Sequence, residues 1–121
     1  MSQIKEHMTQ LIKFEELQEA VFRLAKEIEI DYHGKELIII CPLKGSIMFV
    51  TDLVKNVNLN QKIDFVYLKS IEKGKTVEIL KDVSLNITDK HVLIVEEIID
   101  TGRTLNFLKN RLLTSKPASL Q

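Results

Sequence analysis

The sequence of 121 residues has little of several residue types that mark particular protein classes. Its one cysteine, Cys41, leaves no partner for an internal disulfide, and no signal peptide is recognisable, so we expect a cytoplasmic protein. It has only two prolines and 45% hydrophobic residues, a composition typical of folded rather than disordered chains. Acidic and basic residues balance at 17 each, which indicates neither a nucleic-acid nor a membrane-surface partner. The apolar runs are far shorter than the roughly 20 residues of a membrane span.

What the sequence does contain is an alternation of amphipathic and continuously apolar segments. Apolar residues at spacings of three and four from Phe14 to Ile28 predict an amphipathic helix, with Gly34 as a left-handed cap after it. The run 36–41 predicts a strand buried on both faces, broken by residues 42–46. The remaining expected elements are helices over 47–55 and after Gly102, and strands over 62–70, 76–80, 91–95 and 118–121.

Strands alternating with helices predict one α/β domain over residues 1–121, with a parallel sheet flanked by helices. Ligands in such folds bind beyond the carboxyl ends of the strands. The loops expected at those ends are 42–46, 70–75 and 96–104.

The last of these loops has the features of a phosphate site. The segment Val92 to Thr104 runs from a buried strand through a turn into a helix, whose first backbone N–H groups and dipole favour an anion. Gly102 lets the backbone approach a ligand closely, and Thr101 and Thr104 add hydroxyl donors. The segment is neither a Walker loop nor a dinucleotide fingerprint.

Carboxylates stand directly before this turn. Glu96 and Glu97 follow the buried strand, and carboxylates accept hydrogen bonds from a ribose diol, so a diol site beside a phosphate site suits a ribose 5-phosphate. Asp100 lies between the expected diol site and the expected phosphate site, and it is placed to accept a proton from a base. The alternative is structural: a charged loop before a helix capped by Thr101.

The segment resembles the ribose-phosphate signature of phosphoribosyltransferases, and most closely that of the hypoxanthine-guanine branch. Residues 41–46 are similar to the branch's Leu-Lys-Gly pyrophosphate loop. Residues 63–70 and 77–82 are similar to the strands that lead into and return from its mobile lid. The resemblance covers roughly residues 35–121, and it implies the phosphoribosyltransferase fold.

The resemblance implies a hypoxanthine/guanine phosphoribosyltransferase of purine salvage. Such an enzyme transfers phosphoribose from 5-phosphoribosyl-1-pyrophosphate to a 6-oxopurine, giving a nucleoside monophosphate and pyrophosphate. It also implies Mg²⁺ and a homo-oligomer that associates near the pyrophosphate loop and lid. The alternative is a non-catalytic module that binds phosphoribosyl pyrophosphate or a nucleotide, or an inactive fragment.

The resemblance further implies a role for each matching residue. Glu96 and Glu97 match the acids that hold the ribose hydroxyls, directly or through magnesium, and Asp100 matches the general base near the purine N7. The expected contacts to the phosphates of the substrate are Thr101, Gly102, Arg103 and Thr104 for the 5-phosphate, Leu43, Lys44 and Gly45 for the pyrophosphate, and Ser70 in the lid.

The sequence departs from the family pattern in three places. Glu97 stands where aspartate is usual, which moves the carboxylate by roughly 1.5 Å, one C–C bond. Ile71 replaces the tyrosine of the lid, and the lid itself, residues 72–75, is short. The chain ends at Gln121, about where the family's next strand begins. We therefore expect a domain truncated after the signature helix, without the segment that reads the purine.

Overall fold

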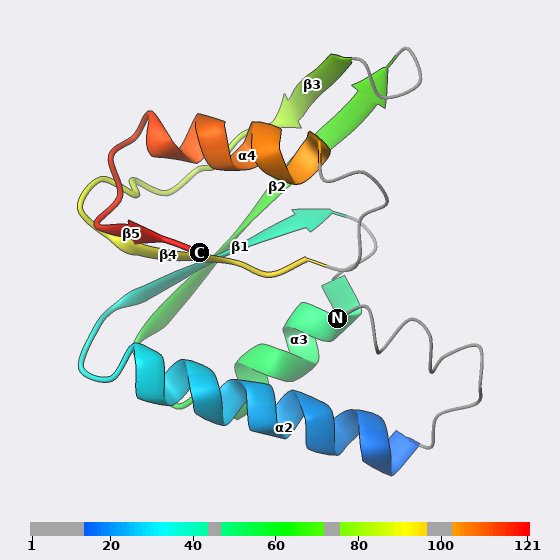
Figure 1. Cartoon of the computed structure of the whole chain (residues 1–121), viewed down its shortest axis with the longest axis vertical. Helices are drawn as coiled ribbons and strands as arrows, with labels where there is room; N and C mark the ends of the chain where they lie inside the picture. Colours follow the sequence, from blue (N-terminus) through cyan, green and yellow to red (C-terminus); the bar gives the residue numbers. More distant parts are fainter. Residues whose placement is uncertain (1–13, 44–46, 72–75, 97–102) are drawn as a thin grey trace.

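The computed structural model describes residues 14–43, 47–71, 76–96 and 103–121. The helices and strands expected from the sequence are all present in these parts (Figure 1), with ends that shift by one to a few residues. In chain order they are α2 (Phe14–Asp31), β1 (Leu37–Leu43), α3 (Ile47–Asn56), β2 (Gln61–Ile71), β3 (Thr76–Lys81), β4 (His91–Ile94), α4 (Arg103–Leu113) and β5 (Ser119–Leu120).

The sheet has the strand order β3-β2-β1-β4-β5 and is parallel except for β3, which returns antiparallel to β2. Leu37 at the start of β1 pairs with Gln61 on one side and His91 on the other. Because β1, β2 and β4 begin in register and run the same way, their carboxyl ends meet at one edge. The expected parallel α/β sheet is confirmed.

Helices cover both faces of this sheet, α2 and α3 on one face and α4 on the other (Figure 1). Side chains of β1 alternate between the two faces: Leu37, Ile39 and Cys41 join the core under α2 and α3. Ile38 and Ile40 join the core under α4. A strand covered on both sides has no face left for polar residues, which explains the unbroken apolar run in the sequence. Cys41 is fully buried there, as expected of a small core residue.

One predicted boundary is wrong: Pro42 does not break β1, which continues to Leu43. Successive residues of a strand direct their backbone groups to alternate neighbours, and the carbonyl of Ile40 accepts a bond from Val95 N on the β4 side. The nitrogen of Pro42, two residues on, faces that same side, where the pairing with β4 has already ended at Ile40. A proline is tolerated because its missing N–H costs no ladder bond.

The C-terminal end of α2 agrees with the sequence pattern. The helix stops at Asp31, and Gly34 follows with a φ of 74°, the left-handed conformation that glycine adopts without strain. Among the described residues, no helix combines the length and the apolar character needed to cross a membrane.

Candidate active site

The structure describes part of the predicted site. Leu43, Ser70, Glu96 and Thr104 are described, and Arg103 is described as the first residue of α4. The other predicted site residues, which lie outside the described residues, are Lys44, Gly45, Glu97, Asp100, Thr101 and Gly102.

The strand ends bring Leu43 and Glu96 to the same edge of the sheet. Leu43 is the last residue of β1 and pairs with Tyr67 of β2. Val95 extends the pairing of β4 with β1 by donating to the carbonyl of Ile40 at 3.0 Å, and Glu96 follows it. The candidate pyrophosphate residue and the first candidate ribose acid therefore both stand at the carboxyl edge, where α/β proteins bind ligands.

Ser70 and Thr104 are also brought together, although 34 positions separate them in the sequence. Their hydroxyl oxygens lie 3.4 Å apart, close enough for a hydrogen bond in which either is the donor. Ser70 belongs to β2, which continues to Ile71, so the loop predicted to start at residue 70 begins later than expected. Thr104 lies in the first turn of α4. The serine of the lid strand thus contacts the helix start that is expected to bind the 5-phosphate.

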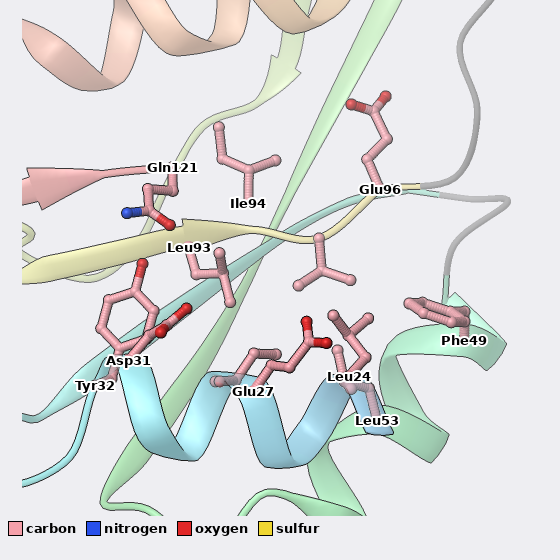
Figure 2. Close-up of a pocket in the computed structure, with 12 residues that line it drawn as sticks. Leu24, Glu27, Asp31, Tyr32, Phe49, Leu53, Leu93, Ile94, Glu96 and Gln121 are labelled. Atoms are coloured by element: carbon pink, nitrogen blue, oxygen red, sulfur yellow. The ribbon is translucent and has the colours of Figure 1, made fainter. Parts of the chain in front are cut away.

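Glu96 is half-buried, and its Oε2 is fully buried without a hydrogen-bond partner among the described residues. Burial raises the pKa of this carboxyl group because the charged form is poorly solvated there. Figure 2 shows Glu96 pointing to the same side of the chain as Ile94, away from Glu27 of α2. Ile94 packs against the core under α4. The unsatisfied carboxylate therefore lies on the α4 side, and such a group costs stability unless a ligand pairs with it.

We predict that Glu96→Gln stabilises the ligand-free protein at neutral pH. The pKa of Glu96 is raised in the folded protein, so ionisation of this carboxyl group destabilises the fold. This destabilisation is absent below about pH 4.3, the pKa of glutamate in the unfolded chain, and it grows as the pH rises to the raised pKa of the folded protein. The thermal midpoint of the variant should exceed that of the parent at pH 7.5 and approach it at pH 4.

The contrasting variant is Glu36→Gln, at the opposite end of the sheet. A hydrogen bond and the charge of Lys90, with the charge of Lys62, lower the pKa of Glu36. The ionised Glu36 carboxylate therefore stabilises the folded protein above about pH 4.3, and this stabilisation is lost as the pH falls through the lowered pKa of the folded state. Glu36→Gln should lower the thermal midpoint at pH 7.5. Equal midpoints for Glu96→Gln and the parent at pH 7.5 would contradict the assignment of Glu96 as an unsatisfied acid.

A cavity of about 220 Å³ lies between β4 and α2, and Glu96 is among the residues that line it (Figure 2). Its lining includes Glu27, Asp31 and the buried Tyr32, whose hydroxyl has no hydrogen-bond partner among the described residues. These residues were not among the site residues predicted from the sequence. The sequence signal for them is the last turn of α2, which carries acids but no basic residue although the helix dipole disfavours negative charge there.

The predicted metal ligands are Glu96 and Glu97, of which only Glu96 is described. The described residues hold no group of three or more His, Cys, Asp or Glu side chains that could bind a metal ion. The Oε2 of Glu96 is nonetheless the kind of ligand atom that Mg²⁺ takes from proteins, a carboxylate oxygen that has no hydrogen-bond partner in the part of the chain that the structure describes. Binding of Mg²⁺ therefore stays a prediction, and the chemistry of this oxygen atom is consistent with it.

Comparisons with known proteins agree with this architecture. The family model described as phosphoribosyl transferase domain matches residues 7–121, almost the whole chain. The chain therefore belongs to the phosphoribosyltransferase family, and the similar proteins place it in the hypoxanthine-guanine branch.

Three of these relatives define the branch. A crystal structure of a hypoxanthine-guanine phosphoribosyltransferase from Bacillus anthracis is 43% identical with a TM-score of 0.88, over 92% of this chain and 68% of that chain. The hypoxanthine-guanine-xanthine phosphoribosyltransferase of Tritrichomonas foetus is 38% identical, over 88% of this chain and 60% of the relative. The hypoxanthine-guanine phosphoribosyltransferase of Streptococcus pneumoniae strain R6 is 36% identical, over 92% of this chain and 64% of the relative. The chain thus spans somewhat under two thirds of these two curated relatives.

Proposed function

We propose that this chain provides the phosphoribosyl-pyrophosphate site of a hypoxanthine/guanine phosphoribosyltransferase of purine salvage. The reaction joins a nitrogen of a 6-oxopurine to the anomeric carbon of the ribose, breaks the bond to pyrophosphate, and yields a nucleoside monophosphate. The observation that carries the proposal is the half-buried Glu96, an acid without a partner among the described residues, at the carboxyl edge of the sheet on the side of α4. A ribose hydroxyl supplies the donor that its Oε2 lacks.

The start of α4 supports a site for the 5-phosphate. The first N–H groups of a helix have no partner within the helix, and the dipole adds partial positive charge at that end. Thr104 lies in this first turn and adds a hydroxyl. The contact of its Oγ1 with Ser70 Oγ places a second hydroxyl beside it. We propose that Thr101, Gly102, Arg103 and Thr104 bind the 5-phosphate, with Ser70 on the lid strand contacting the pyrophosphate side.

The remaining roles follow the family resemblance. Leu43, Lys44 and Gly45 bind the pyrophosphate where β1 ends, and the charge of Lys44 offsets that of the leaving group. Glu96 and Glu97 would hold Mg²⁺ or the ribose hydroxyls. The metal, when bound, neutralises charge on the departing pyrophosphate. Asp100 accepts the proton that the purine loses as its nitrogen bonds to the ribose.

The surroundings of the site suit a reactive sugar. Positive charge develops on the ribose as pyrophosphate leaves, so carboxylates near the ring stabilise the transition state more than the ground state. Exclusion of water by the lid protects the activated sugar from hydrolysis. We further propose, on the family resemblance, that the protein is cytoplasmic and works as a homo-oligomer.

Turnover and binding test the proposal together. The chain is mixed with Mg²⁺, phosphoribosyl pyrophosphate and hypoxanthine, guanine or xanthine, and nucleotide formation is followed. Calorimetry with phosphoribosyl pyrophosphate and Mg²⁺ runs alongside, with Glu96→Gln as the test variant and Glu36→Gln as the matched control. We expect binding that Glu96→Gln weakens by at least about tenfold, equivalent to roughly 1.4 kcal/mol, while Glu36→Gln leaves it unchanged.

The outcomes separate the alternatives. Nucleotide formation supports the enzyme, and the base that reacts fastest identifies the substrate. Binding without turnover favours the non-catalytic module or an inactive fragment. Absence of binding to phosphoribosyl pyrophosphate contradicts the proposal, and so does binding that Glu96→Gln leaves unchanged.

A further inference from the structure

The cavity of about 220 Å³ between α2 and β4 has one polar end and one apolar end. Figure 2 shows Asp31 and Tyr32 together at the end of α2, with Glu27 one turn earlier on the same helix. The side chains gathered at the other end of the cavity are Leu24, Phe49 and Leu53 (Figure 2). A ligand that fills this space therefore meets polar groups at one end and hydrocarbon at the other.

Tyr32 provides a buried group that lacks a partner. It is only 4% exposed and lines the cavity, and its hydroxyl has no hydrogen-bond partner among the described residues. The ring is held by an edge contact to His91, with the ring centres 6.3 Å apart. Burial, and after it the charge of Asp31, raises the pKa of Tyr32, so the hydroxyl is neutral at pH 7. A neutral, buried and unpaired hydroxyl costs stability until a ligand bonds to it.

The charge at this end of the cavity is negative. Glu27 and Asp31 are four residues apart, so their carboxylates stand on one face of α2 on successive turns. The last turn of α2 has no basic residue, and the helix dipole adds partial negative charge there. Glu96 also lines the cavity, but its side chain points away from Glu27 (Figure 2). The electrostatic field of Glu27, Asp31 and the helix end favours a cation.

We propose that this cavity binds a primary alkylammonium, with the ammonium group between Glu27, Asp31 and Tyr32 and the alkyl chain toward Phe49. An ammonium group has three N–H donors, and the two carboxylates and the phenol oxygen are three acceptors. The alkyl chain leaves water as it covers the apolar end. A cavity of about 150 Å³ holds benzene, so about 220 Å³ has room for a chain of about five carbons.

Other cations fit the cavity less well. Mg²⁺ and Ca²⁺ need about six or more oxygen ligands, whereas the described residues hold no group of three or more His, Cys, Asp or Glu side chains that could bind a metal. A guanidinium group is a planar fork that suits one carboxylate at a time. The two acids here stand on different turns of α2, an arrangement that suits the compact charge of an ammonium group.

A titration with three small molecules, followed by NMR of the ¹⁵N-labelled chain at pH 7, tests the proposal. Pentylammonium should give saturable shifts at residues 27–32 and 93–95, with a dissociation constant on the order of a millimolar, as expected of so small a ligand. Pentan-1-ol has the chain without the charge, and methylammonium has the charge without the chain. Each should bind at least about tenfold more weakly than pentylammonium.

Variants test the polar end of the cavity. Glu27→Gln and Asp31→Asn keep the shape of each side chain but remove its charge, so each should weaken pentylammonium binding by about fivefold or more. Tyr32→Phe keeps the buried ring and removes only the hydroxyl, and it should weaken binding by about threefold or more. The matched control is Glu19→Gln, an exposed acid of α2 that does not line the cavity, and it should bind as the parent does.

Circular dichroism checks that each variant is folded. The proposal is overturned if pentan-1-ol binds as tightly as pentylammonium, or if the amides that shift lie away from α2 and β4. It is also overturned if Glu27→Gln, Asp31→Asn and Tyr32→Phe all bind pentylammonium as tightly as Glu19→Gln does.

Discussion

Asp64→Ala is expected to lower the free energy of unfolding by on the order of 3 kcal/mol, because it removes a buried carboxylate and leaves its backbone N–H donors without an acceptor. Asp64 is 6% exposed on β2. Its Oδ2 accepts hydrogen bonds from the backbone N–H groups of Ser84 and Leu85 at 2.6 and 2.9 Å. Its Oδ1 accepts one from Phe65 N at 2.8 Å and lies 3.4 Å from the Nζ of Lys81. Alanine leaves these donors without their acceptor and frees the connection between β3 and β4.

The pH dependence of this effect has a definite sign. Burial acts to raise the pKa of Asp64, but the three backbone donors and the charge of Lys81 outweigh it and hold the pKa below its ordinary value. The stabilisation is therefore complete above the unfolded pKa of about 3.9 and is lost as the pH falls through the lowered folded value. Urea unfolding of the parent and of Asp64→Ala at pH 7 and at pH 3 measures this effect. The difference between their free energies of unfolding should be smaller at pH 3 than at pH 7.

Asp52→Ala is the matched control, since Asp52 is exposed on α3 and its replacement should change stability by no more than about 0.5 kcal/mol. Asp64→Asn should fall between parent and alanine, because its amide oxygen can still accept from one side. If Asp64→Ala unfolds at the same urea concentration as Asp52→Ala, the carboxylate does not hold the β3–β4 connection in place.

Asp100→Asn is expected to lower kcat by a factor on the order of 10²–10⁴, the usual contribution of a general base. The amide keeps the shape of the carboxyl group but cannot take the purine proton. Binding of phosphoribosyl pyrophosphate should persist, because the expected contacts of that substrate are with other residues. Initial rates with saturating substrates and calorimetry on the same preparation measure the two effects separately.

The control is Asp89→Asn, in the connection between β3 and β4, where Asp89 has a φ of 59° that asparagine tolerates well. It should have the parent's kcat. A kcat for Asp100→Asn within a factor of about two of this control would show that Asp100 is not the residue that accepts the proton. A pH–rate profile that loses its acidic limb in Asp100→Asn would tie the titration of the base to this residue.

The local elements of this protein could be predicted from the sequence because they rest on short-range patterns. The periodicity of α2, the apolar run of β1 and the glycine after α2 each depend on a few neighbouring residues. The boundary at Pro42 was wrong for the same reason, since a local rule that proline ends a strand cannot see which neighbour its nitrogen faces.

The relation between distant segments was decided only by the tertiary structure. The sequence shows that Ser70 and Thr104 bear hydroxyls, but their 3.4 Å contact depends on how far β2 extends past β1 and where α4 begins. Likewise, Asp64 reads as one polar residue in a strand, and only the fold directs the backbone of Ser84 and Leu85 to it.

By itself the sequence determined the elements, the doubly covered sheet and the family signature over residues 92–104, since periodicity and motif spacing are properties of the chain alone. Only the tertiary structure decided the burial of Glu96, the lack of a partner for it among the described residues, and its raised pKa. The segments that pack around a residue determine how far it is buried and which hydrogen-bond donors it meets. They therefore also determine whether a buried acid needs a ligand as its partner.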